Sequence, residues 1–176
     1  MDDMADRTQW YAVQLRPRFE KAVAVQVRAK GYEEYLPVYR SRRRWSDRIK
    51  VVELPLFPGY IFCKFDITHR LPILIIPGVA KIVGSGRMPI AIPDHEIEAV
   101  QKVVHSGLAY GPWPALTAGQ RVQVRYGPLA GLEGVVQETR NGCNLIVSVT
   151  LLSRSVSVTI DRDSVVPSTG RSLKTA

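Results

Sequence analysis

The stretch Pro55–Phe62 reads PLFPGYIF, and its last residues begin the run Tyr60–Phe65, YIFCKF. Prolines and a glycine before an apolar run indicate a turn that leads into a strand. Successive side chains of a strand point to opposite faces of its sheet. The run therefore carries two apolar sets, with Ile61, Cys63 and Phe65 on one face and Tyr60 and Phe62 on the other.

The second of these sets is a candidate protein-binding site. We expect Tyr60 and Phe62, together with Phe57 in the preceding turn, to stay uncovered, because a small domain with two or three helices cannot cover both faces of its sheet. Uncovered clusters of aromatic side chains mark contacts with partners. The alternative is that helices cover both faces and that these residues and Phe65 are core.

The residues before Ser106 mix helix and strand patterns around this run. Strands are expected at Trp10–Leu15, Tyr35–Tyr39, Lys50–Leu54 and Ala80–Val83, and helices from Pro17 to Gly31, at Leu71–Ile76 and from Pro93 onward. Proline suits the first position of a helix and glycine follows its end. The order β-α-β-β-β-α-β-α predicts an α+β sandwich with a mainly antiparallel sheet.

A change in composition divides the chain at Ser106–Gly119, SGLAYGPWPALTAG, which holds no charge and has the pattern of a linker. Beyond it, strands are expected at Gln120–Arg125, Glu133–Glu138, Leu145–Leu151, Ser155–Ile160 and Val165–Val166. Five short strands predict a small SH3-like β-barrel, since closure removes exposed sheet edges. We expect a first domain at 8–106, a linker at 107–117 and a barrel domain at 118–167.

The composition is that of an ordinary globular protein. The 176 residues are 45% hydrophobic and 23% charged, which excludes disordered and collagen-like chains. No apolar run reaches the roughly 20 residues of a membrane span, and the start MDDMADR lacks a secretory signal pattern. Cys63 and Cys143 belong to no CxxC or CxxH spacing, so we expect reduced thiols in a cytoplasmic protein.

Charge favours a polyanionic partner such as nucleic acid, because 24 basic residues face 16 acidic ones and the net charge is +8. The excess is concentrated in residues 7–50, with 12 basic and 4 acidic side chains. Arg42, Arg43 and Arg44 are candidates for phosphate contacts at the tip of a hairpin. The alternative is a solvated hairpin whose charges only maintain solubility.

The sequence contains no recognisable catalytic or cofactor-binding pattern. His69, His95 and His105 form no metal-binding set with either cysteine. The Gly84–Gly86 segment precedes Arg-Met-Pro and not a helix start, which excludes a dinucleotide loop. We therefore expect no enzyme activity, no cofactor and no metal, and a hydrolase or transferase is a remote alternative.

Two segments carry a family resemblance. Val122–Val136, VQVRYGPLAGLEGVV, resembles the KOW motif, in which Gly127 and Gly134 let the chain turn. The segment from Trp10, the helix after Phe19 and the PLFPGYIF stretch resemble the NGN domain of NusG-family transcription elongation factors. The resemblance extends from about Trp10 to Pro167. The basic first domain and the atypical KOW loop favour a specialised antiterminator paralogue over the housekeeping protein.

The resemblance implies a monomeric factor that makes no membrane contact and binds the clamp helices of RNA polymerase through its NGN domain, which suppresses pausing. It implies polymerase contacts for Phe57, Tyr60, Phe62 and His69. Its KOW domain would recruit a small-subunit ribosomal protein or Rho, and the matching positions are Leu129, Leu132, Leu151, Leu152 and Arg154. Leu151 or Leu152 could equally be core.

Residues at the first strand-to-helix junction, Arg16, Arg18 and Lys21, match a region that touches the non-template DNA strand in specialised family members. The alternative is a solvated helix face. The rival interpretation of the whole chain is a ribosome- or nucleic-acid-binding KOW protein that does not act on polymerase. Co-purification with core RNA polymerase distinguishes the two.

Overall fold

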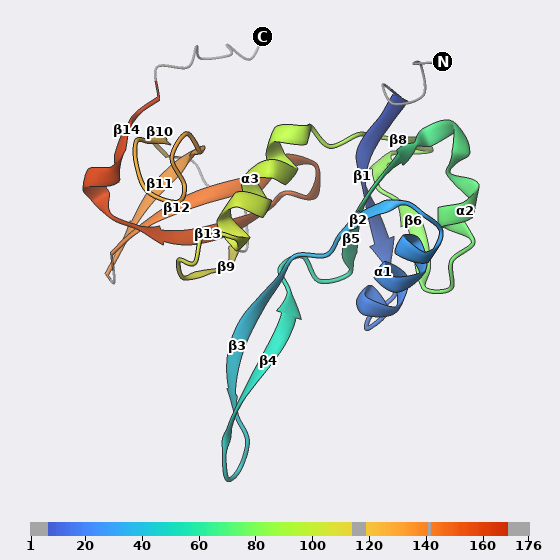
Figure 1. Cartoon of the computed structure of the whole chain (residues 1–176), viewed down its shortest axis with the longest axis horizontal. Helices are drawn as coiled ribbons and strands as arrows, with labels where there is room; N and C mark the ends of the chain where they lie inside the picture. The colour runs from blue at the N-terminus through green and yellow to red at the C-terminus, as the bar shows by residue number, and fades with distance from the viewer. Residues whose placement is uncertain (1–6, 114–118, 141, 169–176) are drawn as a thin grey trace.

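The computed structural model describes residues 7–113, 119–140 and 142–168, which form two larger antiparallel sheets and a long hairpin (Figure 1). The first sheet has the strand order β2-β5-β1-β6. Its strands are β1 (Thr8–Leu15), β2 (Glu33–Tyr35), β5 (Tyr60–Asp66) and β6 (Val79–Ile82). The helices are α1 (Glu20–Ala29), α2 (Leu71–Leu74) and α3 (Asp94–Val104), with the 3-10 turn η2 (Ile67–His69) and the short pair β7 (Gly84–Ser85) and β8 (Met88–Pro89). The predicted α+β class is confirmed.

Helices α1 and α2 cover one face of the first sheet. Ile61, Cys63 and Phe65 of β5 are buried there in one core cluster with Val23 and Val27 of α1. This is the first apolar set predicted from the alternation of the strand, and its shared face is confirmed.

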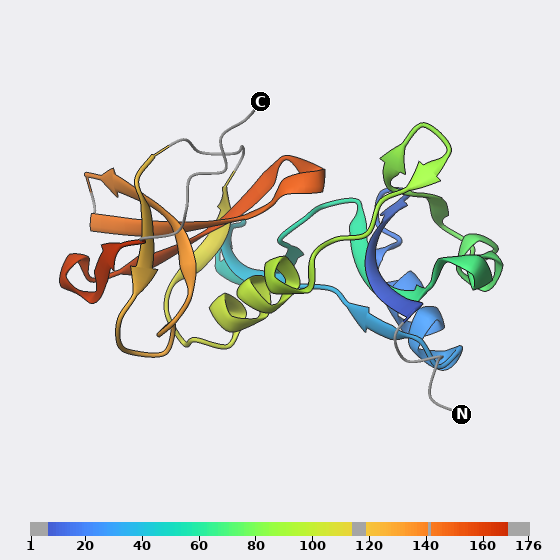
Figure 2. The ribbon, with the colours of Figure 1, turned by 90° about the horizontal axis from the view of Figure 1, so that it is seen from above.

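The opposite face of the first sheet belongs to a second core cluster. Trp10 and Phe62 lie in it together with Val100 of α3. Helix α3 contacts both β1 of the first sheet and β12 of the second sheet. The same core cluster therefore extends from one sheet to the other, with α3 between them (Figure 2).

The second sheet has the order β14-β10-β11-β12-β13-β9. Its strands are β9 (Tyr110–Trp113), β10 (Arg121–Val124), β11 (Glu133–Thr139), β12 (Gly142–Val149), β13 (Arg154–Ile160) and β14 (Val165–Pro167), with the 3-10 turns η3 (Thr150–Leu152) and η4 (Arg162–Ser164). The five predicted strands are present. The sixth, β9, lies inside the predicted linker, where it pairs with β13 and supplies partners for an edge that would otherwise be open.

Gly134 corrects one expectation about the KOW segment. It lies within β11 and not in a turn. A Cβ atom there would come within 2.7 Å of the backbone oxygen of Ile146 on β12, so the close approach of two strands requires glycine. Gly127, with φ of 88°, does serve the predicted turn.

The long hairpin consists of β3 (Val38–Arg44) and β4 (Ile49–Pro55), which pair only with each other. It projects away from both sheets (Figure 1). The strand expected at Tyr35–Tyr39 is divided, because β2 ends at Tyr35 and β3 begins at Val38; Pro37 lies between them and lacks the amide hydrogen that a continuous strand needs. No helix in the described part of the chain is long and apolar enough to cross a membrane.

Candidate functional site

The predicted aromatic site is covered. Phe57 and Phe62 are 1% and 0% exposed, and their rings meet edge to face with centroids 5.3 Å apart. Tyr60 is half-buried at the start of β5. The expectation that these residues form an exposed surface is wrong for this arrangement of the chain, because α3 and the second sheet complete the core on that face.

Polar contacts join the second sheet and its turns to α3 and to the start of the hairpin. The Glu96 carboxylate on α3 accepts hydrogen bonds from the Thr150 amide at 3.2 Å and from the Thr150 hydroxyl at 2.7 Å. The Lys102 ammonium, also on α3, donates to the Ala130 carbonyl. The Tyr110 hydroxyl on β9 donates to the Val38 carbonyl at 2.8 Å. Residues 54 and 72 positions apart in sequence are thereby joined.

The candidate partner-binding residues of the second sheet lie on this contact. The Arg154 guanidinium stacks over the Tyr60 ring, 5.3 Å from its centroid. Such a pair is stabilised by the attraction of a cation to the aromatic face. Leu151 and Leu152 are half-buried and pack against the shared core cluster. The structure thus brings together residues that were predicted as two separate binding sites, one for polymerase and one for another factor.

Leu129 and Leu132 are not surface residues. They are 1% and 7% exposed and belong to the shared core cluster. Burial in this cluster leaves little of either side chain exposed in this arrangement, and their contact with a partner stays a prediction. The sequence pattern of two leucines in a glycine-rich loop does not distinguish a core position from an exposed partner contact.

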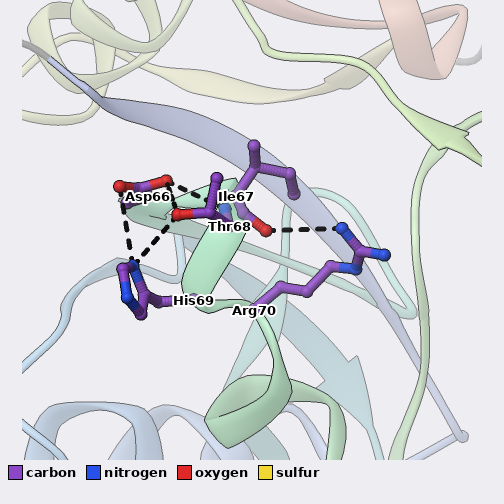
Figure 3. A network of polar contacts seen from close by, with 5 residues as sticks. All are labelled: Asp66, Ile67, Thr68, His69 and Arg70. Carbon is purple, nitrogen blue, oxygen red and sulfur yellow. Dashed lines mark hydrogen bonds and ion pairs between the residues drawn. The ribbon is translucent and has the colours of Figure 1, made fainter.

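His69 lies in a polar network at the end of β5 (Figure 3). The Asp66 carboxylate accepts from the Thr68 amide at 2.8 Å and from the Thr68 hydroxyl at 2.7 Å, and His69 Nδ1 lies 3.6 Å from its other oxygen. These bonds from Thr68, with a smaller contribution from His69, lower the pKa of Asp66. The network caps η2 and leaves the His69 ring exposed.

Arg16, Arg18 and Lys21 are exposed beside the PLFPGYIF turn. The Leu15 amide donates to the Gly59 carbonyl at 2.8 Å, and the Gly59 amide donates to the Glu20 carboxylate at 3.1 Å. Arg18 adopts a φ of 71°, which is uncommon for a residue with a side chain. The junction is therefore held to the turn while its basic side chains face solvent.

Burial raises the pKa values of the buried thiol and phenol groups. Burial, with a smaller contribution from the Glu34 carboxylate, raises the pKa of Cys63 to about 12. Burial also raises the pKa of Cys143. The buried Tyr35 hydroxyl has no hydrogen-bond partner in the described residues, and burial raises its pKa as well. Among the described residues no group of histidine, cysteine and carboxylate side chains could hold a metal ion.

Residues 8–101 match the family described as Transcription termination factor nusG, which covers more than half of the 176-residue chain. The chain belongs to the NusG family. It is 28% identical to the transcription termination/antitermination protein NusG of Campylobacter jejuni subsp. jejuni, over 86% of this chain and 92% of that protein. Its identity to the NusG protein of Escherichia coli K12 is 27%, over 89% of this chain and 94% of that protein.

The NusG fold extends across both sheets. A structure of Thermotoga maritima NusG matches with a TM-score of 0.54 at 23% identity, over 92% of this chain and 97% of that one. The predicted NGN-like first part and KOW-like second part are consistent with this match.

Sequence reasoning on this NusG-family chain missed the residues that join the sheets. Glu96, Lys102, Tyr110 and Thr150 carry no distinctive motif. Glu96 has the pattern of an ordinary acidic residue in the first turn of a helix, and Tyr110 lies in the predicted linker. Their role depends on a contact between distant segments, for which the sequence holds no local signal.

Proposed function

We propose that this chain is a transcription elongation and antitermination factor whose NGN domain binds the clamp helices of RNA polymerase through Phe57, Tyr60 and Phe62. His69 would extend that contact, and Arg16, Arg18 and Lys21 would touch the non-template DNA strand. The second domain would recruit a small-subunit ribosomal protein or Rho through Leu151, Leu152 and Arg154. Family membership supports this proposal, together with the names of relatives that are termination/antitermination proteins.

The observation that supports the mechanism is the contact of Arg154 with the ring of Tyr60, which packs against the core cluster that holds Phe57 and Phe62. Each candidate site blocks the other in this arrangement. Binding to polymerase would require the second domain to leave the aromatic face, which would release Leu151, Leu152 and Arg154 at the same time. The two recruitment events are therefore coupled through one opening step.

The test is co-purification of core RNA polymerase with variants of the full chain. Glu96→Ala removes both bonds to Thr150 and should increase the recovered polymerase, because it favours the open arrangement. Glu98→Ala is the matched control, since it removes the same charge from an exposed position of α3. Adding Tyr60→Ala to Glu96→Ala should reduce affinity about thirtyfold, the typical loss when a central aromatic anchor is truncated.

Three outcomes would contradict the proposal or its opening step. If Tyr60→Ala leaves polymerase binding intact in the opened variant, the aromatic face is not the contact. If both wild type and the opened variant follow ribosomes and recover no polymerase, the chain is a ribosome-binding KOW protein. Equal recovery by the Glu96 and Glu98 variants would show that opening does not limit binding.

A further inference from the structure

The register of the long hairpin separates its basic residues onto two faces. Directly paired residues of an antiparallel hairpin share a face, and faces alternate along each strand. Arg43 pairs with Lys50, and the next pair toward the tip, Arg44 with Ile49, lies on the other side. Trp45 and Arg48 close the hairpin, since the Trp45 amide donates to the Arg48 carbonyl at 2.8 Å and the Arg48 amide returns a bond at 3.3 Å.

We name the two sides by their composition. The tryptophan face consists of Arg43, Trp45, Arg48 and Lys50, and the opposite face consists of Arg42, Arg44, Ile49 and Val51. The three adjacent arginines of the sequence are therefore divided, with one on the tryptophan face and two on the opposite face. Residues that are neighbours in the chain do not form one patch.

The tryptophan face combines an exposed indole with three cations. Trp45 is 58% exposed, although tryptophan is highly buried in most proteins. The Lys50 ammonium lies over the indole, 5.9 Å from its centroid. All four side chains are exposed, and within the described residues none of the three cations has a carboxylate partner. Asp47 lies in the turn between Trp45 and Arg48 and is the nearest acid along the chain.

We propose that the tryptophan face binds a single strand of DNA, with an unpaired base stacked on the Trp45 indole and the backbone phosphates held by Arg43, Arg48 and Lys50. Proteins that bind single strands combine aromatic stacking platforms with a cationic track for the backbone, and this face has both. In a duplex the bases are already stacked on one another, so the indole has no free base to contact.

Other partners fit this face less well. A duplex would be held by charge alone, and the opposite face, with Arg42 and Arg44, would serve it equally. RNA is distinguished from DNA through its 2′-hydroxyl, and none of the four side chains that define the tryptophan face is a neutral hydrogen-bonding group; Ser41, the next residue on that side of β3, is half-buried. A hairpin that only maintains solubility needs the cations but gains nothing from an indole at its tip. This inference goes beyond the proposed function and needs no polymerase for its test.

The experiment measures binding of the full chain to a fluorescein-labelled 15-nucleotide oligothymidine by anisotropy, across a salt series. Trp45→Ala should weaken binding roughly tenfold, the effect of losing one stacked base, and Trp45→Phe should restore part of it because the ring returns. A DNA duplex of equal length and an oligouridine of equal length serve as the competing ligands. The duplex should bind more weakly, and the oligouridine should bind no more tightly than oligothymidine.

The matched control uses the opposite face. Arg43→Gln with Lys50→Gln and Arg42→Gln with Arg44→Gln each remove two positive charges from the same hairpin. The first pair should weaken binding and reduce the slope of log K against log salt by about 1.4, since a single-strand phosphate contact contributes about 0.7. The second pair should leave the slope close to that of wild type. These outcomes would support the tryptophan face as the binding surface.

Three results would overturn the inference. Equal losses from the two charge pairs would mean that only net charge matters. Unchanged binding by Trp45→Ala would show that no base stacks on the Trp45 indole. Tighter binding of the duplex or of the oligouridine would assign the face to a different nucleic acid. None of these results depends on whether the aromatic face of β5 binds polymerase, so the inference and the proposed function fail separately.

Discussion

The hairpin β3–β4 and the strand β5 that follows it share an alternating pattern of side chains but differ in whether their faces are buried. Both have two distinct faces, and fewer than ten residues separate Val51 from Tyr60. On β5 both faces are covered, one by α1 and α2 and the other by α3 and the second sheet. On the hairpin tip neither face is covered, and Trp45, Ile49 and Val51 are all more than half exposed. Alternation thus specifies which side chains share a face, whereas more distant segments determine whether that face is covered.

The largest expected effect compares a covered with an uncovered apolar side chain. Phe62→Ala should lower the free energy of unfolding by about 3–5 kcal/mol, because it leaves a cavity in the shared core cluster. Val51→Ala on the hairpin should change it by less than about 0.5 kcal/mol, since its side chain is 54% exposed. Urea denaturation of both variants tests this contrast. Similar losses of unfolding free energy would mean that Phe62 is no better buried than Val51.

A second prediction concerns the face of β5 that the helices cover. The pKa of Cys63 is raised to about 12, so the folded state retains the thiol proton after the unfolded chain has released it. The stabilisation that the protonated thiol contributes is therefore fully present below pH 9. It is lost as pH rises from there toward 12, by about 1.4 kcal/mol per pH unit. Denaturation between pH 8 and pH 10 should show this decline in wild type and a shallower one in Cys63→Ala. Identical slopes would indicate that the thiol is not protected by burial.

The third prediction concerns the contact between α3 and the second domain, which we propose opens when polymerase binds. A double-mutant cycle of Glu96→Ala and Thr150→Val should give a coupling free energy of about 1 kcal/mol, the usual value for a hydrogen bond outside the core. Glu98→Ala with Thr150→Val is the control and should give a coupling near zero. Both cycles are measured by denaturation of the full chain. Equal couplings would argue against a specific bond between α3 and η3.

The smallest effect is expected at the exposed end of β5. Thr68→Ala removes the hydroxyl donor and should raise the pKa of Asp66 toward its ordinary value, because the bonds from Thr68 are the main cause of its lowering. A carboxyl pKa that is lower in the folded state stabilises that state at pH values above the pKa of the unfolded chain. This contribution disappears as pH falls through the pKa of the folded state. Carboxyl chemical shifts followed by NMR at acidic pH test this. A pKa equal in both proteins would contradict the network.

Much of the fold could be predicted from local pattern. The PLFPGYIF turn, the two faces of β5 and the five β-branched strands of the second part depend on neighbours in the sequence, and the structure confirms them. The predicted exposure of Phe62 is wrong, Leu129 is buried, and β9 forms within residues that were expected to be linker. Each of these depends on how distant segments meet, and the contact between Glu96 and Thr150 spans 54 positions. The sequence contains the alternation of Trp45 with Arg43, but only the register shows that Arg48 and Lys50 share their face.

The strand β9 has a consequence for the reach of the second domain. Because Tyr110–Trp113 is paired with β13, the tether between α3 and the second sheet consists of the five residues from His105 to Ala109. Fully extended, five residues span at most about 18 Å. If the second domain is released as we propose, a tether this short would keep it at a local concentration on the order of millimolar beside the aromatic face of β5. A partner that binds the aromatic face would therefore compete with the tethered second domain. The second domain would rebind that face soon after the partner dissociates.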